Sequence, residues 1–242
     1  MAAGTYSAKC NSDLKPVLSQ AREICKNLGD KGIPLPLFGV GISLGGTILL
    51  NTCLELMHSS SRDQPSLDGL ACISSPLDLA ECSAAIERPR NSLYQGWLLQ
   101  RLVRQTLEDP FGVSDSEKFA LSRIRTFSIG KVSSIRSFDS AITAPRWGFS
   151  DVDDYYKSAS PLEALLRNPP EMPKTLFIQS LDDPWVPSQA AESLSKSINA
   201  IEGSSPFQVC ITSYGGHNGF HGKGGCWGDE LVKRWLLKLV NK

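Results

Sequence analysis

Several residue types and patterns that define other classes of protein are absent from this sequence. Its 25 lysines and arginines are balanced by 25 acidic residues, so a strongly basic nucleic-acid surface is not predicted. No apolar run reaches the roughly 18 residues that a membrane-spanning helix needs. The opening stretch MAAGTYSAKCNSD contains no apolar core of a secretory signal and is too weakly basic for a transit peptide. No organelle is therefore predicted, and contact with a membrane surface stays open.

Disulfide frameworks and thiol motifs are also missing. The seven cysteines are odd in number and widely spaced, and no Cys-x-x-Cys occurs. This favours single thiols in a reduced, intracellular compartment. Cys53, Cys72 and Cys210 lie in apolar segments, where free cysteine packs as a small hydrophobic residue. No activating pattern accompanies any of the seven, so a catalytic cysteine is not favoured.

Histidine is scarce, with three in the chain, and this limits the choice of metal ligands. His217 and His221 have a zinc-like spacing, but Asn218 stands where a metalloprotease helix needs Glu. A phosphate loop ending at Lys223 also fails, because His217 occupies the required glycine position and Gly224 replaces Ser or Thr. Neither a metal nor another cofactor is therefore predicted.

Strands and helices are predicted to alternate at both ends of the chain. Short apolar runs predict strands at 35–40, 67–75, 175–180 and 207–214, and helical periodicity predicts helices at 12–28, 44–58, 188–199 and 227–240. Ser12 is expected to cap the first helix and Gly29 to end it. The alternation favours an α/β fold with a mostly parallel sheet flanked by helices.

The middle block is predicted to be helical and to contain no strand. Helices are expected near 77–87, 91–108, 115–125, 132–142 and 151–167, the last restarting at a capping box from Ser160 to Glu163. We therefore divide the chain into an α/β core over 1–76 and 170–242 and a helical cap insert over 77–169. Aromatic residues of the insert are expected to form its core, with some lining a pocket over the site as the alternative.

The stretch FGVGISLGGTILL at 38–50 places a serine between a predicted strand and a predicted helix. Gly41-x-Ser43-x-Gly45 in this context is the pattern of a nucleophile elbow. The two glycines permit a tight turn and close packing of strand and helix. The backbone N–H of Leu44, at the start of the helix, is expected to donate to a developing oxyanion. Ser43 is thus a candidate nucleophile.

A serine nucleophile needs a base and a group that orients the base. His217 follows the strand at 207–214 in a glycine-rich loop, and His221 in the same loop is the second choice. His58 is interpreted as a solvated helix end. Asp182 and Asp183 both follow the strand at 175–180, and either can orient the base while the other caps the next helix. The order Ser, Asp, His is that of α/β-hydrolases.

From about residue 6 to its end, the sequence resembles the YheT-like branch of α/β-hydrolases, which contains short-chain carboxylesterases and acylglycerol lipases. The resemblance is carried by GISLGGTILLN (41–51), SSPLDLAEC (74–82), IRSFDSAITAPRWGFSDVDDYYKSASP (135–161), SLDDPWVP (180–187) and YGGHNGF (214–220). It implies Ser43 as nucleophile, His217 as base and Asp183 as acid, since the acid directly precedes the proline of Asp-Pro-x-x-Pro. It also implies an α/β-hydrolase fold and a small ester or acylglycerol as substrate.

The resemblance further implies that an upstream part of the fold is missing from this chain. Members of the branch place there the first strands of the sheet and a His-Gly loop that supplies a second oxyanion donor. The strand before Ser43 is then expected to lie at a sheet edge. We expect a serine carboxylesterase or monoacylglycerol-lipase-like enzyme, or alternatively a catalytically impaired fragment, splice form or incomplete gene model of one.

Overall fold

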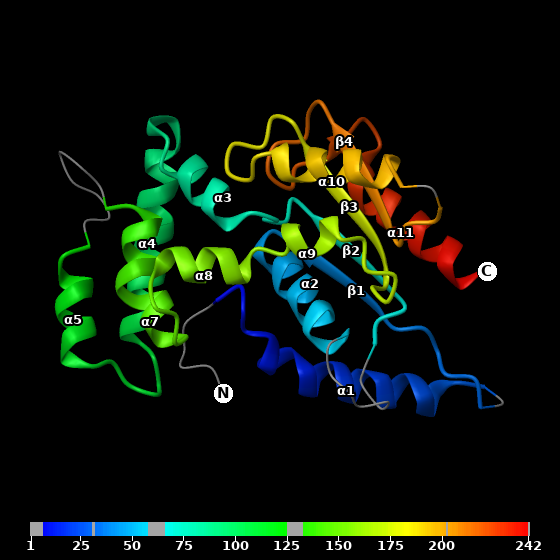
Figure 1. The fold of residues 1–242 in the computed structure, drawn as a ribbon, viewed down its shortest axis with the longest axis horizontal. Helices are drawn as coiled ribbons and strands as arrows, with labels where there is room; N and C mark the ends of the chain where they lie inside the picture. Colours follow the sequence, from blue (N-terminus) through cyan, green and yellow to red (C-terminus); the bar gives the residue numbers. More distant parts are fainter. Residues whose placement is uncertain (1–6, 31, 58–65, 125–132, 202, 242) are drawn as a thin grey trace. The chain divides into compact units, whose positions relative to one another are not determined.

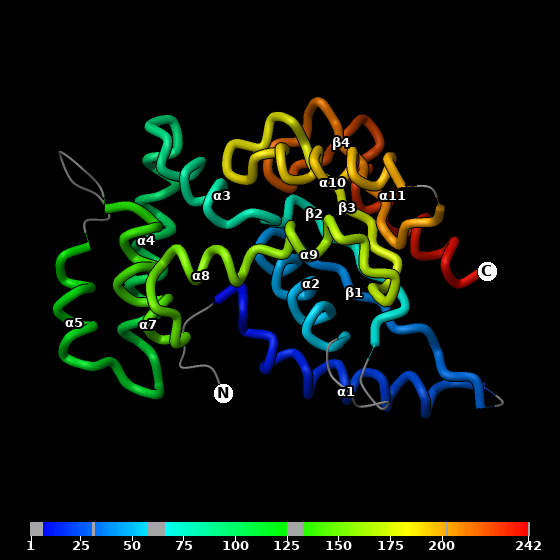
Figure 2. Tube along the Cα trace, viewed as in Figure 1, coloured from blue at the N-terminus to red at the C-terminus, as the bar shows by residue number. Residues whose placement is uncertain are grey.

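The computed structural model describes residues 7–30, 32–57, 66–124, 133–201 and 203–241 (Figures 1 and 2). These residues form two compact units. The helical unit comprises Asp78–Ala159 and Ser7, and the sheet unit comprises Ala8–Leu77 and Ser160–Lys242, each within the described ranges. His58, the predicted solvated helix end, lies outside the described residues. No helix within these ranges combines the length and apolar character required to cross a membrane.

The sheet unit is built on four parallel strands. They are β1 (Phe38–Ile42), β2 (Gly69–Ile73), β3 (Lys174–Ser180) and β4 (Phe207–Thr212), and they pair in the order β1-β2-β3-β4. Val40 pairs with Ala71 in β2, and Ala71 pairs with Leu176 in β3. All four carboxyl ends therefore lie at the same edge of the sheet, which brings the segments after them together. The predicted parallel α/β sheet is confirmed.

Alternate residues of the strands enter two separate apolar cores, because successive strand side chains point to opposite faces. Leu70 and Cys72 of β2 belong to one core, and Ala71 and Ile73 belong to the other. The first core is completed by side chains of α1 (Asn11–Leu28), α2 (Leu44–Met57), α9 (Leu162–Leu166) and α10 (Gln189–Asn199). The second is covered by α11 (Trp227–Val240). Helices thus cover both faces, as a parallel sheet requires.

β1 forms one edge of the sheet in the part of the chain that the structure describes. Val40 and Ile42 of this strand are 48% and 55% exposed. An apolar groove of about 440 Å³ runs between them and α11, where Leu236 and Val240 line it. This edge position agrees with the one expected for the strand before Ser43.

Two predictions about helix starts are wrong, and one about a helix end is confirmed. α1 begins at Asn11 after Cys10, which makes no side-chain cap, so Ser12 is already inside the helix. Gly29 ends α1 as predicted: it is the C-cap residue, its backbone turns to extended angles, and an added Cβ would overlap the carbonyl oxygen of Ile33. The N-cap residue of α9 is Pro161, so the helix does not start from Ser160 as the predicted capping box requires.

α9 also changes the expected boundary of the helical block. Leu165 is fully buried in the core that contains Leu50 and Leu194, and the N–H of Leu162 donates to the carbonyl of Leu77. Residues 160–169 therefore lie with the sheet unit and not with the helical insert over 77–169. A five-residue helix carries too little periodicity to show in advance which core receives its leucines.

The helical unit contains no strand among its described residues. Its elements are α3 (Leu79–Ile86), η1 (Pro89–Asn91), α4 (Ser92–Leu107), α5 (Asp115–Ser122), α6 (Ile135–Phe138), a π-helical turn η2 (Asp139–Thr143), α7 (Ala144–Arg146) and α8 (Val152–Ala159). Leu99, Leu121, Phe138 and Ile142 form its core. The predicted helix at 132–142 is instead α6 continued by η2 and α7.

Candidate active site

Ser43 lies at a sharp turn between β1 and α2. Its φ of +52° is in the left-handed region, which a residue with a Cβ adopts at a cost of about 1–3 kcal/mol. Hydrogen bonds hold the turn: the Ser43 N–H donates to the carbonyl of Ile73 (2.8 Å), and the Gly46 N–H donates to the carbonyl of Ser43 (3.0 Å). The strained residue is therefore fixed between two strands and a helix, the strand–turn–helix context of a nucleophile elbow.

The close approach of β1 and α2 is made by Gly41 and Gly46. A Cβ on Gly41 would overlap the Cα of Gly46, and a Cβ on Gly46 would overlap the hydroxyl oxygen of Ser75. By contrast, a Cβ on Gly45 would meet no neighbouring atom within 4 Å. The sequence reasoning therefore missed Gly46. The Gly-Gly pair after the serine was the available signal, but the pattern Gly-x-Ser-x-Gly draws attention to its first member.

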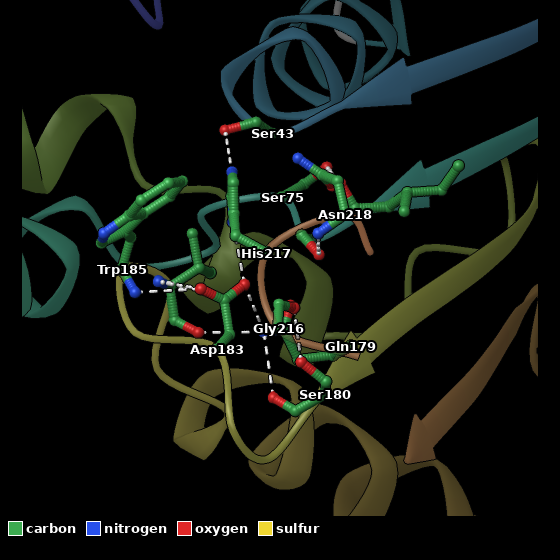
Figure 3. Close-up of polar contacts among 12 residues, drawn as sticks. Ser43, Ser75, Gln179, Ser180, Asp183, Trp185, Gly216, His217 and Asn218 are labelled. Carbon is green, nitrogen blue, oxygen red and sulfur yellow. Dashed lines mark hydrogen bonds and ion pairs between the residues drawn. The ribbon is translucent and has the colours of Figure 1, made fainter. Parts of the chain in front are cut away.

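The structure brings Ser43, His217 and Asp183 together, although they are far apart in the sequence (Figure 3). The Nε2 atom of His217 lies 3.0 Å from the Oγ of Ser43, and its Nδ1 atom lies 2.9 Å from an Oδ of Asp183. An imidazole protonated on Nδ1 satisfies both contacts, because it donates to the carboxylate and accepts from the serine hydroxyl. The three residues follow β1, β4 and β3 at the carboxyl edge of the sheet.

The side chain of Asp183 is fully buried and its carboxylate is held by neighbouring donors. One oxygen accepts from the backbone N–H groups of Trp185 (2.9 Å) and Val186 (3.0 Å), and the other accepts from the Nε2 of Gln179 (3.3 Å). Gln179 also donates to the carbonyl of Val186 (2.9 Å). These bonds fix the carboxylate plane toward His217.

The other polar residues considered from the sequence lie elsewhere. Asp182 is exposed and accepts from the backbone N–H of Gly216 (2.8 Å). His221 is exposed in the short pair formed by β5 (His221–Gly222) and β6 (Gly225–Cys226). The structure thus places His217 next to Ser43 and Asp183 next to His217, whereas Asp182 bonds the backbone of Gly216. The described residues hold no group of three metal-ligating side chains.

Two further features bear on the site. The ring of Trp185 packs against the ring of His217, with centroids 4.8 Å apart, a contact that the sequence reasoning did not foresee. Leu44 is the first residue of α2, so no carbonyl within the helix can accept its N–H. That N–H and the positive end of the helix dipole are available to a negative charge beside Ser43.

Comparisons with known proteins identify relatives of this chain. No protein-family model matches the chain. Phospholipase ABHD3 of Bos taurus is 27% identical over 242 residues, which are 98% of this chain and 52% of the relative. The "Putative esterase YheT" of Escherichia coli (strain K12) is 29% identical over 212 residues, which are 85% and 56%. Monoacylglycerol lipase of Saccharomyces cerevisiae is 28% identical over 210 residues, which are 82% and 40%.

The fold and the relatives together define a class of protein. The chain belongs to the α/β-hydrolase superfamily, which both its parallel sheet and its relatives support. Within that superfamily it is similar to esterase YheT and phospholipase ABHD3, as the resemblance in the sequence motifs implied. It spans about half the length of these two relatives.

Proposed function

We propose that the sheet unit carries a serine hydrolase site that cleaves carboxylic esters, in the manner of a short-chain carboxylesterase or a monoacylglycerol lipase. The unbroken hydrogen-bonded series from Asp183 through His217 to Ser43 carries this proposal. The names of the relatives, an esterase, a lipase and a phospholipase, support an ester or acylglycerol as substrate.

The reaction follows from the positions of the three side chains. The Oγ of Ser43 attacks the ester carbonyl carbon while the Nε2 of His217 removes the hydroxyl proton. The tetrahedral intermediate collapses, the C–O bond to the alcohol breaks, and the imidazolium returns the proton to the leaving alcohol. Water then attacks the acyl-enzyme by the same route, with His217 again as base, and releases the carboxylic acid. Asp183 stabilises the imidazolium in both steps.

The negative oxygen of the intermediate needs donors that are already in place. We assign one of them to the N–H of Leu44, at the start of the 14-residue helix α2. Removing one oxyanion donor from a serine hydrolase costs about 10²–10³-fold in rate. Gly41 and Gly46 support this arrangement by letting α2 begin directly against β1.

A fluorophosphonate probe tests the proposal, because it modifies only a serine activated by a base. Intact mass should show a single adduct on the wild-type chain and none on Ser43→Ala or His217→Ala. Ser158→Ala is the matched control, since Ser158 is an exposed serine of the helical unit and should leave labelling unchanged. Circular dichroism checks that each variant is folded.

The outcomes separate the two readings of the site. Labelling that persists on Ser43→Ala would show that the nucleophile is wrong. A folded wild-type chain without any adduct would favour the alternative, a catalytically impaired fragment of a hydrolase. If labelling is found, turnover of p-nitrophenyl esters and monoacylglycerols of increasing acyl length identifies the preferred substrate.

A further inference from the structure

We propose that Asp182 is a positioning residue for His217. It holds the peptide group of Gly216, the residue directly before the base, so that the imidazole stays between Ser43 and Asp183. The two adjacent aspartates then have separate tasks: Asp183 contacts the imidazole, and Asp182 anchors the loop that carries it. This inference rests on the proposed function of the same site.

Both polar groups of Gly216 are bonded to the end of β3 and the residues after it. Its N–H donates to an Oδ of Asp182 (2.8 Å). Its carbonyl accepts from the hydroxyl of Ser180 (2.7 Å), and Ser180 is fully buried (Figure 3). Gly216 has a φ of +53°, a conformation that favours glycine. Gly216 lies in a turn outside any helix or strand. These two hydrogen bonds therefore hold its backbone in place.

The residue after His217 is tied down as well. The N–H of Asn218 donates to the hydroxyl of Ser74, directly after β2, over 3.3 Å. The N–H of Gly219 donates to the carbonyl of Gly215 (2.9 Å), which closes the loop on itself. His217 therefore lies between two anchored neighbours, and its ring has only side-chain rotation left, which Trp185 and Asp183 restrict.

The two carboxylates differ in what their partners require. Asp183 is buried against an imidazole that becomes positively charged during catalysis, so its negative charge matters. Asp182 is exposed and bonds a neutral backbone N–H, so it needs only an acceptor oxygen. Asparagine keeps an acceptor oxygen but loses the charge. Replacement by asparagine should therefore have little effect on kcat at position 182 and lower kcat strongly at position 183.

The test compares Asp182→Ala, Asp182→Asn and Asp183→Asn, with Asp229→Ala as the control for loss of an exposed aspartate elsewhere in the sheet unit. Rates of p-nitrophenyl ester hydrolysis give kcat and KM. Asp182→Ala should lower kcat by about fivefold with KM unchanged, the loss expected for one hydrogen bond whose strength does not depend on the charge of its acceptor. Asp182→Asn should keep kcat within about twofold of wild type. Asp183→Asn should lower kcat by about 10³–10⁴-fold.

Hydrogen–deuterium exchange gives a readout that does not depend on activity. The backbone amides of residues 213–220 should exchange faster in Asp182→Ala and at the wild-type rate in Asp182→Asn and Asp229→Ala. If the wild-type chain neither turns over esters nor reacts with the fluorophosphonate, the proposed function fails, and exchange still decides whether Asp182 holds the loop.

Two results would overturn the inference. In the first, Asp182→Ala keeps both the wild-type kcat and the wild-type exchange of the loop. In the second, Asp182→Asn is as impaired as Asp182→Ala, which would mean that the charge of Asp182, and not its bond to Gly216, is what the site uses.

Discussion

The two adjacent glycines after Ser43 provide a sharp test of how the elbow is packed. Both lie in the first turn of α2, but Gly46 is buried and Gly45 is exposed. A Cβ added to Gly46 would overlap the Ser75 hydroxyl oxygen and lie 2.9 Å from its Cβ and 3.1 Å from the carbonyl oxygen of Gly41. Gly45→Ala and Gly46→Ala add the same methyl group, one into open space and one into a filled site.

The magnitudes follow from this difference. Replacing glycine by alanine within a helix stabilises by about 0.5–1 kcal/mol where nothing obstructs the methyl group. Overpacking a filled site costs about 1–3 kcal/mol. Ser75 can relieve the overlap only in part, because its hydroxyl donates to the carbonyl of Ile73 (3.3 Å) and its own Cβ is also too close. The helix contribution is common to both variants, so they should differ in unfolding free energy by about 1–3 kcal/mol, with Gly46→Ala the less stable.

Urea unfolding measures that difference, and the rate of fluorophosphonate labelling reports on the nucleophile. Labelling should be slowed in Gly46→Ala, since the Gly46 N–H bonds the carbonyl of Ser43, and should be unchanged in Gly45→Ala. Equal stability of the two variants would refute the packing argument. Equal labelling rates, despite a stability difference, would show that the turn at Ser43 does not depend on this contact.

Two predictions concern the helical unit. Arg146→Met should lower the unfolding free energy in urea by about 3–5 kcal/mol. The substitution removes the cation that pairs with Glu117 (2.6 Å) and leaves the fully buried carboxylate of Asp109 without a positive partner. A loss under 1 kcal/mol would contradict this, and adding Asp109→Asn should recover part of the loss. Burial raises the pKa of Asp139 to about 6, above its value in the unfolded chain. The protonated carboxyl therefore adds to the unfolding free energy at pH 4, and this addition is lost as the pH rises through 6. Urea unfolding should show that the unfolding free energy of wild type, relative to that of Asp139→Asn, falls by up to about 3 kcal/mol between pH 4 and 7.5. If this relative free energy stays flat or rises with pH, the raised pKa of Asp139 is refuted.

Much of the fold could be predicted because its signals are local. The helix at 227–240 is found at those residues, and the strand at 175–180 is found one residue longer at its start. Parallel strands buried on both faces read as short apolar runs, and amphipathic helices repeat at three and four residues. Predictions failed where the deciding contact was distant in sequence, as with Leu165, whose burial depends on residues of α2 and α10.

The sequence by itself determined the α/β class and the candidate nucleophile, since a strand, a turn glycine and a helix around Ser43 are encoded within 20 residues. It also limited the base to a few histidines and the acid to two neighbouring aspartates. The family resemblance favoured Asp183 over Asp182, but only the tertiary structure shows which partner each meets at the sheet edge: His217 for Asp183 and the Gly216 N–H for Asp182. The tertiary structure likewise revealed Gly46 and Trp185, whose roles come from Ser75 and His217, far away in the chain. Local patterns fix elements, whereas the pairing of side chains from separate strand ends exists only once the sheet has formed.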